Sequence, residues 1–399
     1  MGLEHYLNAD FDLGLQSGWR LPDGEATRHR ITDLAWHGLF LAEPGDSALL
    51  PEPIPPDFVA YLDRLGIEVP AVTVEPDRGP GQRLAPFGWN DRTAELARRY
   101  DSPADHPDLE IVRWVNGRRF SARLEDELFS GGHTISVLSD EGELRDLLSA
   151  LPASETGWLL KAEHGNAGLG NRRLRAPILT DGDLKVVRRY FEGNEAVVLE
   201  RWRRRLRDLC ATFVVGRNGE ALGFDLHEVV NTADGALIGD LFFEETRELS
   251  EWWPSMTETA AAVASRLAEE GYFGPACIDA FLWDDHGRVR LRRLVDLNAR
   301  REISAGASRL WRRIGADGVG YWRFYSRRKL DLGDTYPEVE RRFGADAFDP
   351  DRGRGVLITA PVWLGPHRRP PTKIAVLLVG RDRDEVLRRD CRLREVFEK

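Results

Sequence analysis

The sequence has 399 residues, of which 42% are hydrophobic and 31% charged, and its 56 basic and 66 acidic side chains give a net charge of −10. This composition is typical of a globular chain long enough for two or three domains, and the acidic balance argues against a nonspecific nucleic-acid binder. No apolar run approaches the roughly 20 residues that cross a bilayer, so no membrane segment is expected.

The cysteines indicate a reducing compartment. Cys210, Cys277 and Cys391 lie far apart and form no C-x-x-C pair, which disfavours a disulfide scaffold or a zinc ribbon. The first residues also lack the basic start and apolar core of a secretory signal. We therefore expect a cytoplasmic protein in which Cys210 and Cys277, which fall within expected strands, are core residues.

The first 130 residues predict an α/β domain. Residues 1–33 carry few periodic apolar positions, so we expect them to wrap a surface. Expected strands and helices follow in an order that favours a parallel sheet covered by helices. The strands are expected at about 35–42, 69–74 and 111–115, and the helices at about 56–65, 91–100 and 119–128. Asn90 or Asp91 can cap the second of these helices.

The next 180 residues predict α+β structure with antiparallel strands. Turn signals separate several apolar runs, which indicates hairpins. Strands are expected at about 134–138, 158–160, 196–201, 209–215, 223–230, 236–243, 276–282 and 288–297. Helices are expected at about 141–151, 181–191 and 255–270.

A glycine loop follows the strand that begins at Trp158. Lys161 ends the apolar run, and glycines then occur at positions 165, 168 and 170. Glycine lacks a Cβ atom, so backbone N–H groups in such a loop can approach a ligand closely. A lysine beside a glycine loop is a common way to hold a polyphosphate. A tight hairpin with a surface lysine is the alternative for this stretch alone.

Three oxygen-bearing side chains lie on two strands downstream. Asp296 and Asn298 are two apart in one expected strand, so they point to the same face, and a hairpin partner could bring Asp279 beside them. Carboxylate and carboxamide oxygens suit Mg²⁺. Alternatively, the Asp-x-Asn pair only ends a strand. Arg300 and Arg301 follow, and their guanidinium groups match phosphate or carboxylate geometry.

The end of the strand at 196–201 offers a site for a nucleotide base. Glu200 and Trp202 lie where an apolar strand leaves for a linker, which can provide a flat slot and backbone hydrogen bonds. Asp208 follows and could accept hydrogen bonds from ribose hydroxyls. Each of these residues, taken alone, is equally consistent with a structural role.

The order of these features resembles the ATP-grasp superfamily, in which two α+β lobes close on ATP. The resemblance covers about Thr134 to Trp311, and the preceding α/β parallel-sheet region resembles a pre-ATP-grasp domain. It implies four parts: a pre-ATP-grasp domain at 1–130, a small lobe at 131–200, a large lobe at 201–330 and an extension at 331–399 that packs on the core.

The resemblance also implies roles for particular residues. Lys161 would hold the ATP phosphates together with the loop residues Gly165, Asn166, Ala167, Gly168 and Gly170. Glu200 and Trp202 would form the adenine hinge, and Asp208 would contact the ribose. Asp279, Asp296 and Asn298 would bind one or two Mg²⁺ ions, although Asp296 stands where the family usually has Glu. Arg300 would face the transferred group. Arg118 or Arg119 is the candidate for a second upstream cation.

The implied activity is that of a carboxylate–amine ligase. A carboxylate, for example of an amino acid or peptide, would attack the γ-phosphate of ATP, and an amine would then displace phosphate from the acylphosphate. The alternatives are an ATP-grasp phosphotransferase and a nucleotide-binding protein without ligase activity. Small-molecule substrates are implied, and a homodimer is compatible with the family.

Overall fold

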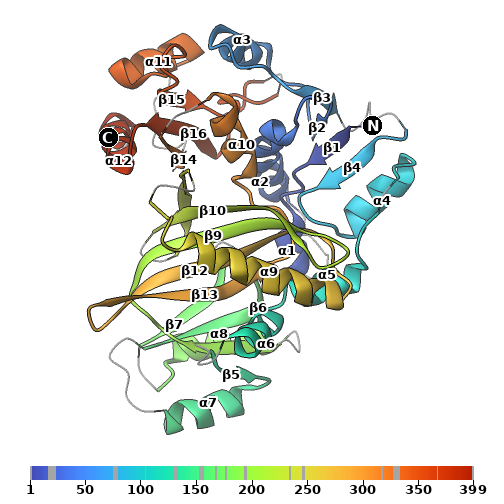
Figure 1. Cartoon of the computed structure of the whole chain (residues 1–399), viewed down its shortest axis with the longest axis vertical. Helices are drawn as coiled ribbons and strands as arrows, with labels where there is room; N and C mark the ends of the chain where they lie inside the picture. Colours follow the sequence, from blue (N-terminus) through green and yellow to red (C-terminus); the bar gives the residue numbers. More distant parts are fainter. Residues whose placement is uncertain are drawn as a thin grey trace.

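The computed structural model describes residues 2–16, 24–74, 80–103, 105–129, 134–151, 157–166, 169–175, 178–192, 196–232, 235–244, 248–315, 318–326, 333–365 and 367–397. Three β-sheets organise these residues (Figure 1). The N-terminal sheet and the smallest lobe lie at opposite ends of the molecule, and the largest sheet runs between them.

The N-terminal domain is built on a four-stranded parallel sheet of order β3-β2-β1-β4. Its strands are β1 (Leu3–Tyr6), β2 (Ser47–Leu50), β3 (Ala71–Val74) and β4 (Arg83–Pro86). Its helices are α1 (Phe11–Gln16), α2 (Glu25–Ala35), η1 (Trp36–Leu41), α3 (Pro56–Arg64), α4 (Asp91–Arg99), α5 (Leu109–Val115) and α6 (Arg118–Leu128). The expected parallel sheet is confirmed, as is the cap of α4: the Asn90 side chain accepts a hydrogen bond from Thr93 N.

Three expectations for this domain were wrong. Residues 1–33 do not simply wrap a surface, because Leu3–Tyr6 is an interior strand and Phe11 is fully buried. The stretch 35–42 forms the 3₁₀ helix η1 rather than a strand, and 111–115 lies in helix α5. The last two errors have one cause. In a short run in which nearly every residue is apolar, the spacing of apolar residues does not distinguish a strand from a helix.

The small lobe is a four-stranded antiparallel sheet of order β5-β8-β6-β7. Its strands are β5 (Thr134–Leu138), β6 (Trp158–Asn166), β7 (Leu169–Leu174) and β8 (Val197–Arg201). Helices α7 (Glu141–Ala150) and α8 (Asp181–Phe191) pack on it, and their buried Leu144, Leu148 and Val187 share a core with Trp158 and Leu160. The predicted glycine loop connects β6 to β7.

The large sheet has eight strands in the order β13-β12-β9-β10-β11-β14-β16-β15, and every neighbouring pair is antiparallel. Its strands are β9 (Arg205–Val215), β10 (Ala221–Asn231), β11 (Leu237–Phe242), β12 (Gly274–Asp285), β13 (Arg288–Asn298), β14 (Val319–Ser326), β15 (Gly355–Ile358) and β16 (Lys373–Gly380). The expected hairpins at 209–243 and 276–297 are confirmed.

Helices surround this sheet. Helix α9 (Trp253–Glu269) lies across β9 and β10 (Figure 1), and its Met256, Val263 and Leu267 are buried in the main core. The other elements are α10 (Ala305–Arg313), α11 (Tyr336–Phe343), η4 (Gly344–Asp346) and α12 (Arg383–Phe397). Strands β15 and β16 join the segment after residue 331 to the large sheet; the domain boundaries themselves stay a prediction. Among the described residues, no helix combines the length and the apolar character needed to cross a membrane.

Candidate active site

Nine of the predicted site residues converge on one cleft between the small lobe, the large sheet and the N-terminal domain, whereas Glu200 and Gly170 are not among its described lining residues. The cleft has a volume of about 1680 Å³. The predicted residues that line it are Arg118, Lys161, Gly165, Trp202, Asp208, Asp279, Asp296, Asn298 and Arg300. Residues that are 182 positions apart in the chain, Arg118 and Arg300, therefore face the same space.

Lys161 joins the two lobes at the bottom of this cleft. Strand β6 carries the lysine, which is 2% exposed. Its Nζ atom lies 3.2 Å from Glu200 Oε1 on β8 and 3.2 Å from Asp296 Oδ1 on β13, and it donates to the backbone oxygen of Val295 at 3.3 Å. A buried ammonium between two carboxylates is compensated in charge. The hairpin with a merely surface-exposed lysine is thereby excluded.

Glu200 belongs to a buried ion-pair chain. Besides Lys161, its carboxylate contacts Arg292 Nη1 at 2.8 Å, and Arg292 in turn makes two hydrogen bonds to Glu125 at 2.9 and 2.8 Å. Burial raises the pKa of Glu200, but Lys161 and Arg292 outweigh it and bring the pKa to about 2. The Glu200 carboxylate is therefore occupied by ion pairs with Lys161 and Arg292. Contacts of this residue with an adenine ring would have to come from its backbone atoms.

The three candidate metal ligands lie side by side. Asp279 and Asp296 are directly paired in the β12–β13 hairpin, and Asn298 Nδ2 donates to Asp279 Oδ2 at 3.2 Å. Burial, together with the negative charges of Asp296 and Glu302, raises the pKa of Asp279 to about 7. Two carboxylates that repel each other beside a carboxamide fit a hard divalent cation, because the ion would neutralise that repulsion.

Of the adjacent residues Arg118 and Arg119, one flanks the metal ligands. Arg118, at the start of α6, lies 2.7 Å from Asp296 Oδ1. Arg119 is directed to the buried Glu163 instead, at 3.2 Å. Of the two upstream candidates, Arg118 is therefore the one that reaches the cleft. Sequence spacing could not choose between them, because adjacent residues at a helix start point in different directions.

Arg300 is held from several sides. Its guanidinium contacts Asp12 of α1 at 3.2 Å and Glu302 at 3.2 Å, and Nη2 donates to Asn298 Oδ1 at 3.4 Å. It also lies 4.8 Å from the ring centre of Phe87. The N-terminal domain thus orients this arginine through Asp12 and Phe87.

Two further lining residues of the cleft, Trp202 and Asp208, already have protein partners. Arg173 lies 4.4 Å from the centre of the Trp202 ring. Asp208 accepts hydrogen bonds from Arg205 at 2.9 Å and from Asn231 at 3.1 Å. Arg173 therefore orients the Trp202 ring that would contact a base, and Arg205 and Asn231 orient the Asp208 carboxylate that would contact a ribose.

The glycine loop is described only in part. Gly165 lines the cleft, and Gly170 has φ +88°, a conformation that favours glycine. Asn166 pairs with Leu169 across the hairpin. Ala167 and Gly168 lie outside the described residues, so their predicted contacts stay a prediction.

Comparison with known proteins bears on the fold. No family model matches the sequence, and no curated protein matches it. Among solved structures, N5-carboxyaminoimidazole ribonucleotide synthetase from Thermus thermophilus matches with a TM-score of 0.52 and 16% identity, over 93% of this chain and 96% of that chain. The Aspergillus clavatus synthase, in complex with ADP and 5-aminoimidazole ribonucleotide, has a TM-score of 0.50 and 12% identity, over 85% and 94%. A Staphylococcus aureus synthetase has the same score and identity, over 89% and 91%.

The chain has the ATP-grasp fold. Within this fold, the parallel sheet β1–β4 corresponds to the pre-ATP-grasp domain. The two sheets that carry Lys161 and Asp296 are the small and large lobes. The expected fold class is confirmed, whereas the role of each site residue stays a prediction.

Several residues that hold the site residues in place escaped the sequence analysis. Arg292 and Glu125 complete the charge balance of Glu200, and Asp12 and Glu302 hold Arg300. Arg292 alternates with exposed arginines in an Arg-rich strand, so composition gave no signal. Glu302 could have been noticed, because it lies two residues after Arg300.

Proposed function

We propose that this chain is an ATP- and Mg²⁺-dependent ligase that joins a carboxylate to an amine through an acylphosphate and releases ADP and phosphate. One observation carries the proposal: two cations, Lys161 and Arg118, converge on Asp296, one of three adjacent oxygen donors, inside one large cleft. The ATP-grasp fold and the names of its structural neighbours support the same reaction class.

The protein groups act by position and charge. Lys161, Arg118 and the N–H groups of the glycine loop would hold the triphosphate, and Asp279, Asp296 and Asn298 would bind Mg²⁺, which offsets the negative charge of the phosphates. The substrate carboxylate then attacks the γ-phosphorus, and the bond to the ADP oxygen breaks. Arg300, fixed by Asp12 and Glu302, would face the anionic acyl group.

The second step transfers the acyl group. The amine attacks the acyl carbon, an amide bond forms, phosphate leaves and the amine loses a proton. Closure of the small lobe over the large sheet would exclude water, which would otherwise hydrolyse the acylphosphate. We further propose small-molecule substrates and a cytoplasmic location, and a homodimer is compatible with the fold.

An isotope experiment tests the reaction. Pairs of amino acids with ¹⁸O in the carboxylate would be screened for ADP release, with mass detection of product and phosphate. A ligase places one ¹⁸O in the released phosphate, because the carboxylate oxygen bonded to phosphorus leaves with it. ADP release with phosphorylated substrate and no amide would indicate a phosphotransferase. Mg-ATP that does not raise the Tm of the protein would overturn nucleotide binding altogether.

A further inference from the structure

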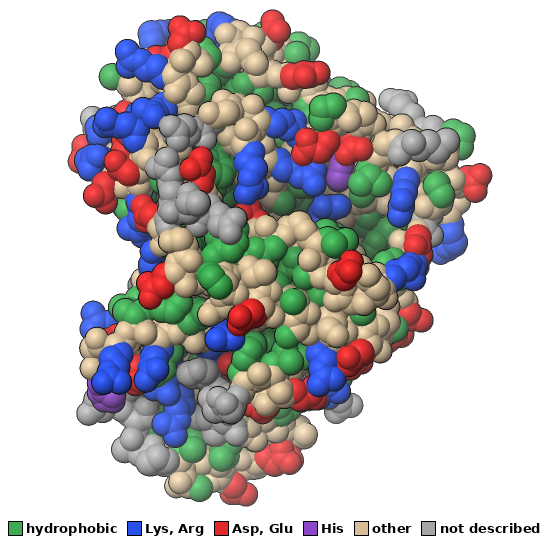
Figure 2. All heavy atoms as spheres, in the orientation of Figure 1, with side chains coloured by type: hydrophobic (Ala, Val, Ile, Leu, Met, Phe, Trp, Pro, Cys, Tyr) green, Lys and Arg blue, Asp and Glu red, His purple; other side chains and the backbone are tan. Residues whose placement is uncertain are grey.

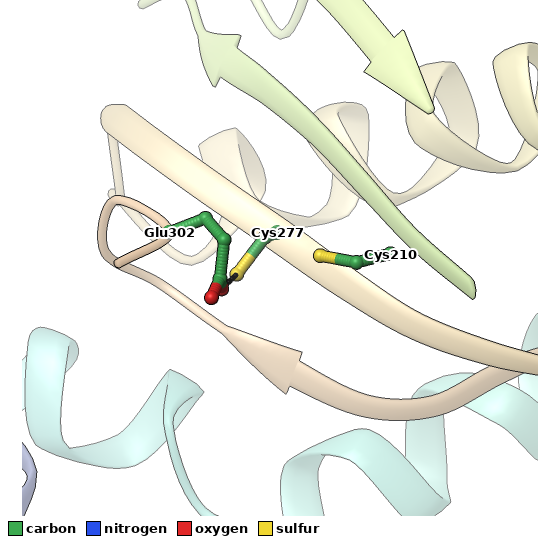
Figure 3. Close-up of side chains that lie close together, drawn as sticks. All are labelled: Cys210, Cys277 and Glu302. Carbon is green, nitrogen blue, oxygen red and sulfur yellow. Dashed lines mark hydrogen bonds between the residues drawn. The ribbon is translucent and has the colours of Figure 1, made fainter. Parts of the chain in front are cut away.

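Two buried cysteines and a glutamate form a cluster beside the candidate Mg²⁺ ligands. Cys210 lies on β9, Cys277 lies on β12, and Glu302 follows β13. One ligand atom from each of the three lies within 4.8 Å of the other two. Figure 3 shows the Cys277 sulfur pointing toward the Glu302 carboxylate and the Cys210 sulfur pointing toward Cys277. Cys277 Sγ and Glu302 Oε2 are 3.4 Å apart.

The strand register explains why these side chains meet. Cys210 pairs with Asp279 across β9 and β12, and Cys277 lies two residues before Asp279. Residues two apart in a strand point to one face, so both thiols lie on the face that carries Asp279. His227 on β10 is the register partner of Cys210 and extends this polar row by one strand.

Buried polar groups adjoin the cluster. Asp240 is 0% exposed, and the Ser304 hydroxyl is the donor beside its carboxylate among the described residues. His227 Nε2 lies 3.8 Å from Asp240 Oδ1 and makes no hydrogen bond to a described residue. A buried atom of this kind is rare in folded proteins, and it points to an ion or a water molecule that satisfies it.

We propose that Cys210, Cys277 and Glu302 bind a thiophilic divalent cation, Zn²⁺ or a close relative, separate from the Mg²⁺ site. The fourth donor would be a water molecule or the neighbouring His227–Asp240 pair. Thiolate sulfur selects zinc-like ions over Mg²⁺, which prefers oxygen. Binding releases the two thiol protons to solvent.

The distances suit a tetrahedral site. Zn–S bonds of about 2.3 Å and Zn–O bonds of about 2.1 Å give a sulfur-to-oxygen edge of roughly 3.6 Å. The observed separation of Cys277 Sγ and Glu302 Oε2 is 3.4 Å. The charges also balance closely: two thiolates and one carboxylate oppose the dication, and Arg300 already pairs with Glu302 at 3.2 Å. A hydrogen-bonded outer partner of this kind is usual for a carboxylate ligand.

Such an ion would tie the segment after β13 to the large sheet. Glu302 would be fixed to β9 and β12 through the metal, and Arg300 would be positioned through Glu302. The ion therefore acts as a structural support for the active-site arginine. This inference does not depend on the proposed ligase activity, because metal binding is measured without ATP.

Cobalt substitution tests the site. The full chain, stripped with a chelator, would be titrated with Co²⁺, and we expect one equivalent with a near-ultraviolet thiolate-to-cobalt charge-transfer band. Millimolar Mg²⁺ should leave the band unchanged. Cys277→Ser should weaken the band, because one of the two thiolates is lost, and should lower Zn²⁺ affinity by at least the roughly tenfold that loss of an outer-shell partner costs. Cys391→Ser is the matched control, because Cys391 is exposed on α12, and it should retain both.

Two outcomes would overturn the proposal: a folded wild-type protein that shows no charge-transfer band with Co²⁺, or a band that persists in the Cys210→Ser/Cys277→Ser double variant. Circular dichroism would establish that the variants fold. If they do not, Glu302→Gln, which keeps both thiols, should weaken Co²⁺ binding and shift the band, and an unchanged titration would likewise overturn the site.

Discussion

Lys161 Nζ lies 3.2 Å from Asp296 Oδ1, although 135 positions separate the two residues in the chain. The contact joins the small lobe to the large sheet, and Glu200 completes it from a third strand. It places the candidate phosphate-binding cation directly beside a candidate metal ligand, so the properties of the cleft can be tested one residue at a time.

Figure 2 shows one face of the molecule, with Lys and Arg side chains gathered in the hollow between its upper parts and others scattered over the surface.

Lys161→Ala should reduce the rise in Tm that Mg-ATP produces, because it should weaken ATP binding at least about tenfold, or about 1.4 kcal/mol. The reason is the loss of the one ammonium that lies between Glu200 and Asp296. Calorimetric titration measures the affinity. Lys185→Ala removes an exposed lysine of α8 and should leave ATP binding intact. Wild-type affinity in the Lys161 variant would remove it from the site.

Asp296→Asn should reduce metal-dependent turnover on the order of a hundredfold, because it removes one of the two adjacent carboxylates that suit Mg²⁺. The Mg²⁺ dependence of ADP formation measures the effect. Asp285→Asn, at the far end of the same hairpin, is the control and should behave as the wild type. An unchanged Mg²⁺ titration in the Asp296 variant would contradict the metal assignment.

Trp202→Ala should raise the KM for ATP about tenfold with little change in kcat, since stacking on a base contributes roughly 1–3 kcal/mol. Initial rates at varied ATP concentration give both constants. Trp283→Ala is the matched control: Arg203 lies 4.3 Å from that ring centre, but Trp283 is not among the described residues that line the cleft. Equal KM values for the two variants would take Trp202 out of the nucleotide site.

Arg292→Met should destabilise the fold by about 3–5 kcal/mol, because it leaves Glu200 and Glu125 buried without their shared cation. Urea unfolding measures the change. The neighbouring Arg293 is half-exposed and lies 3.9 Å from its carboxylate partner, so Arg293→Met should cost less than about 1 kcal/mol. Similar losses for the two variants would argue against the buried ion-pair chain.

His37→Phe should remove part of the acid sensitivity of the fold. His37 is buried against Trp322 and Phe324, and burial, aided by Lys373, lowers its pKa from 6.5 to about 3. Below pH 6.5 His37 is protonated in the unfolded chain but stays neutral in the folded chain. The free energy of unfolding therefore falls as the pH drops from 7 toward 3. The loss between pH 7 and pH 5 is about 2 kcal/mol from this residue.

Denaturant unfolding at both pH values measures that loss. The variant should lose about 2 kcal/mol less than the wild type over the same interval. Parallel pH dependences of the two proteins would show that His37 is protonated in the folded state or reaches solvent.

The sequence by itself determined the parts of this protein that have local or ordered signals. The Asn90 side chain caps α4 by accepting from an N–H group only three residues later, and turn residues between apolar runs mark the hairpins at 209–243. The order of Lys161, the glycine loop and the Asp-x-Asn pair was enough to indicate the ATP-grasp fold. These signals depend only on residues near in sequence or on their order.

Only the tertiary structure decided which charges meet. Arg118, and not Arg119, contacts Asp296. Glu200 forms an ion pair with Arg292. Cys210 and Cys277 lie next to each other and to Glu302. The apolar run at Trp36–Leu41 forms a 3₁₀ helix and not a strand. Electrostatic and packing free energies depend on distances between strands that are remote in sequence, and no spacing along one chain encodes those distances.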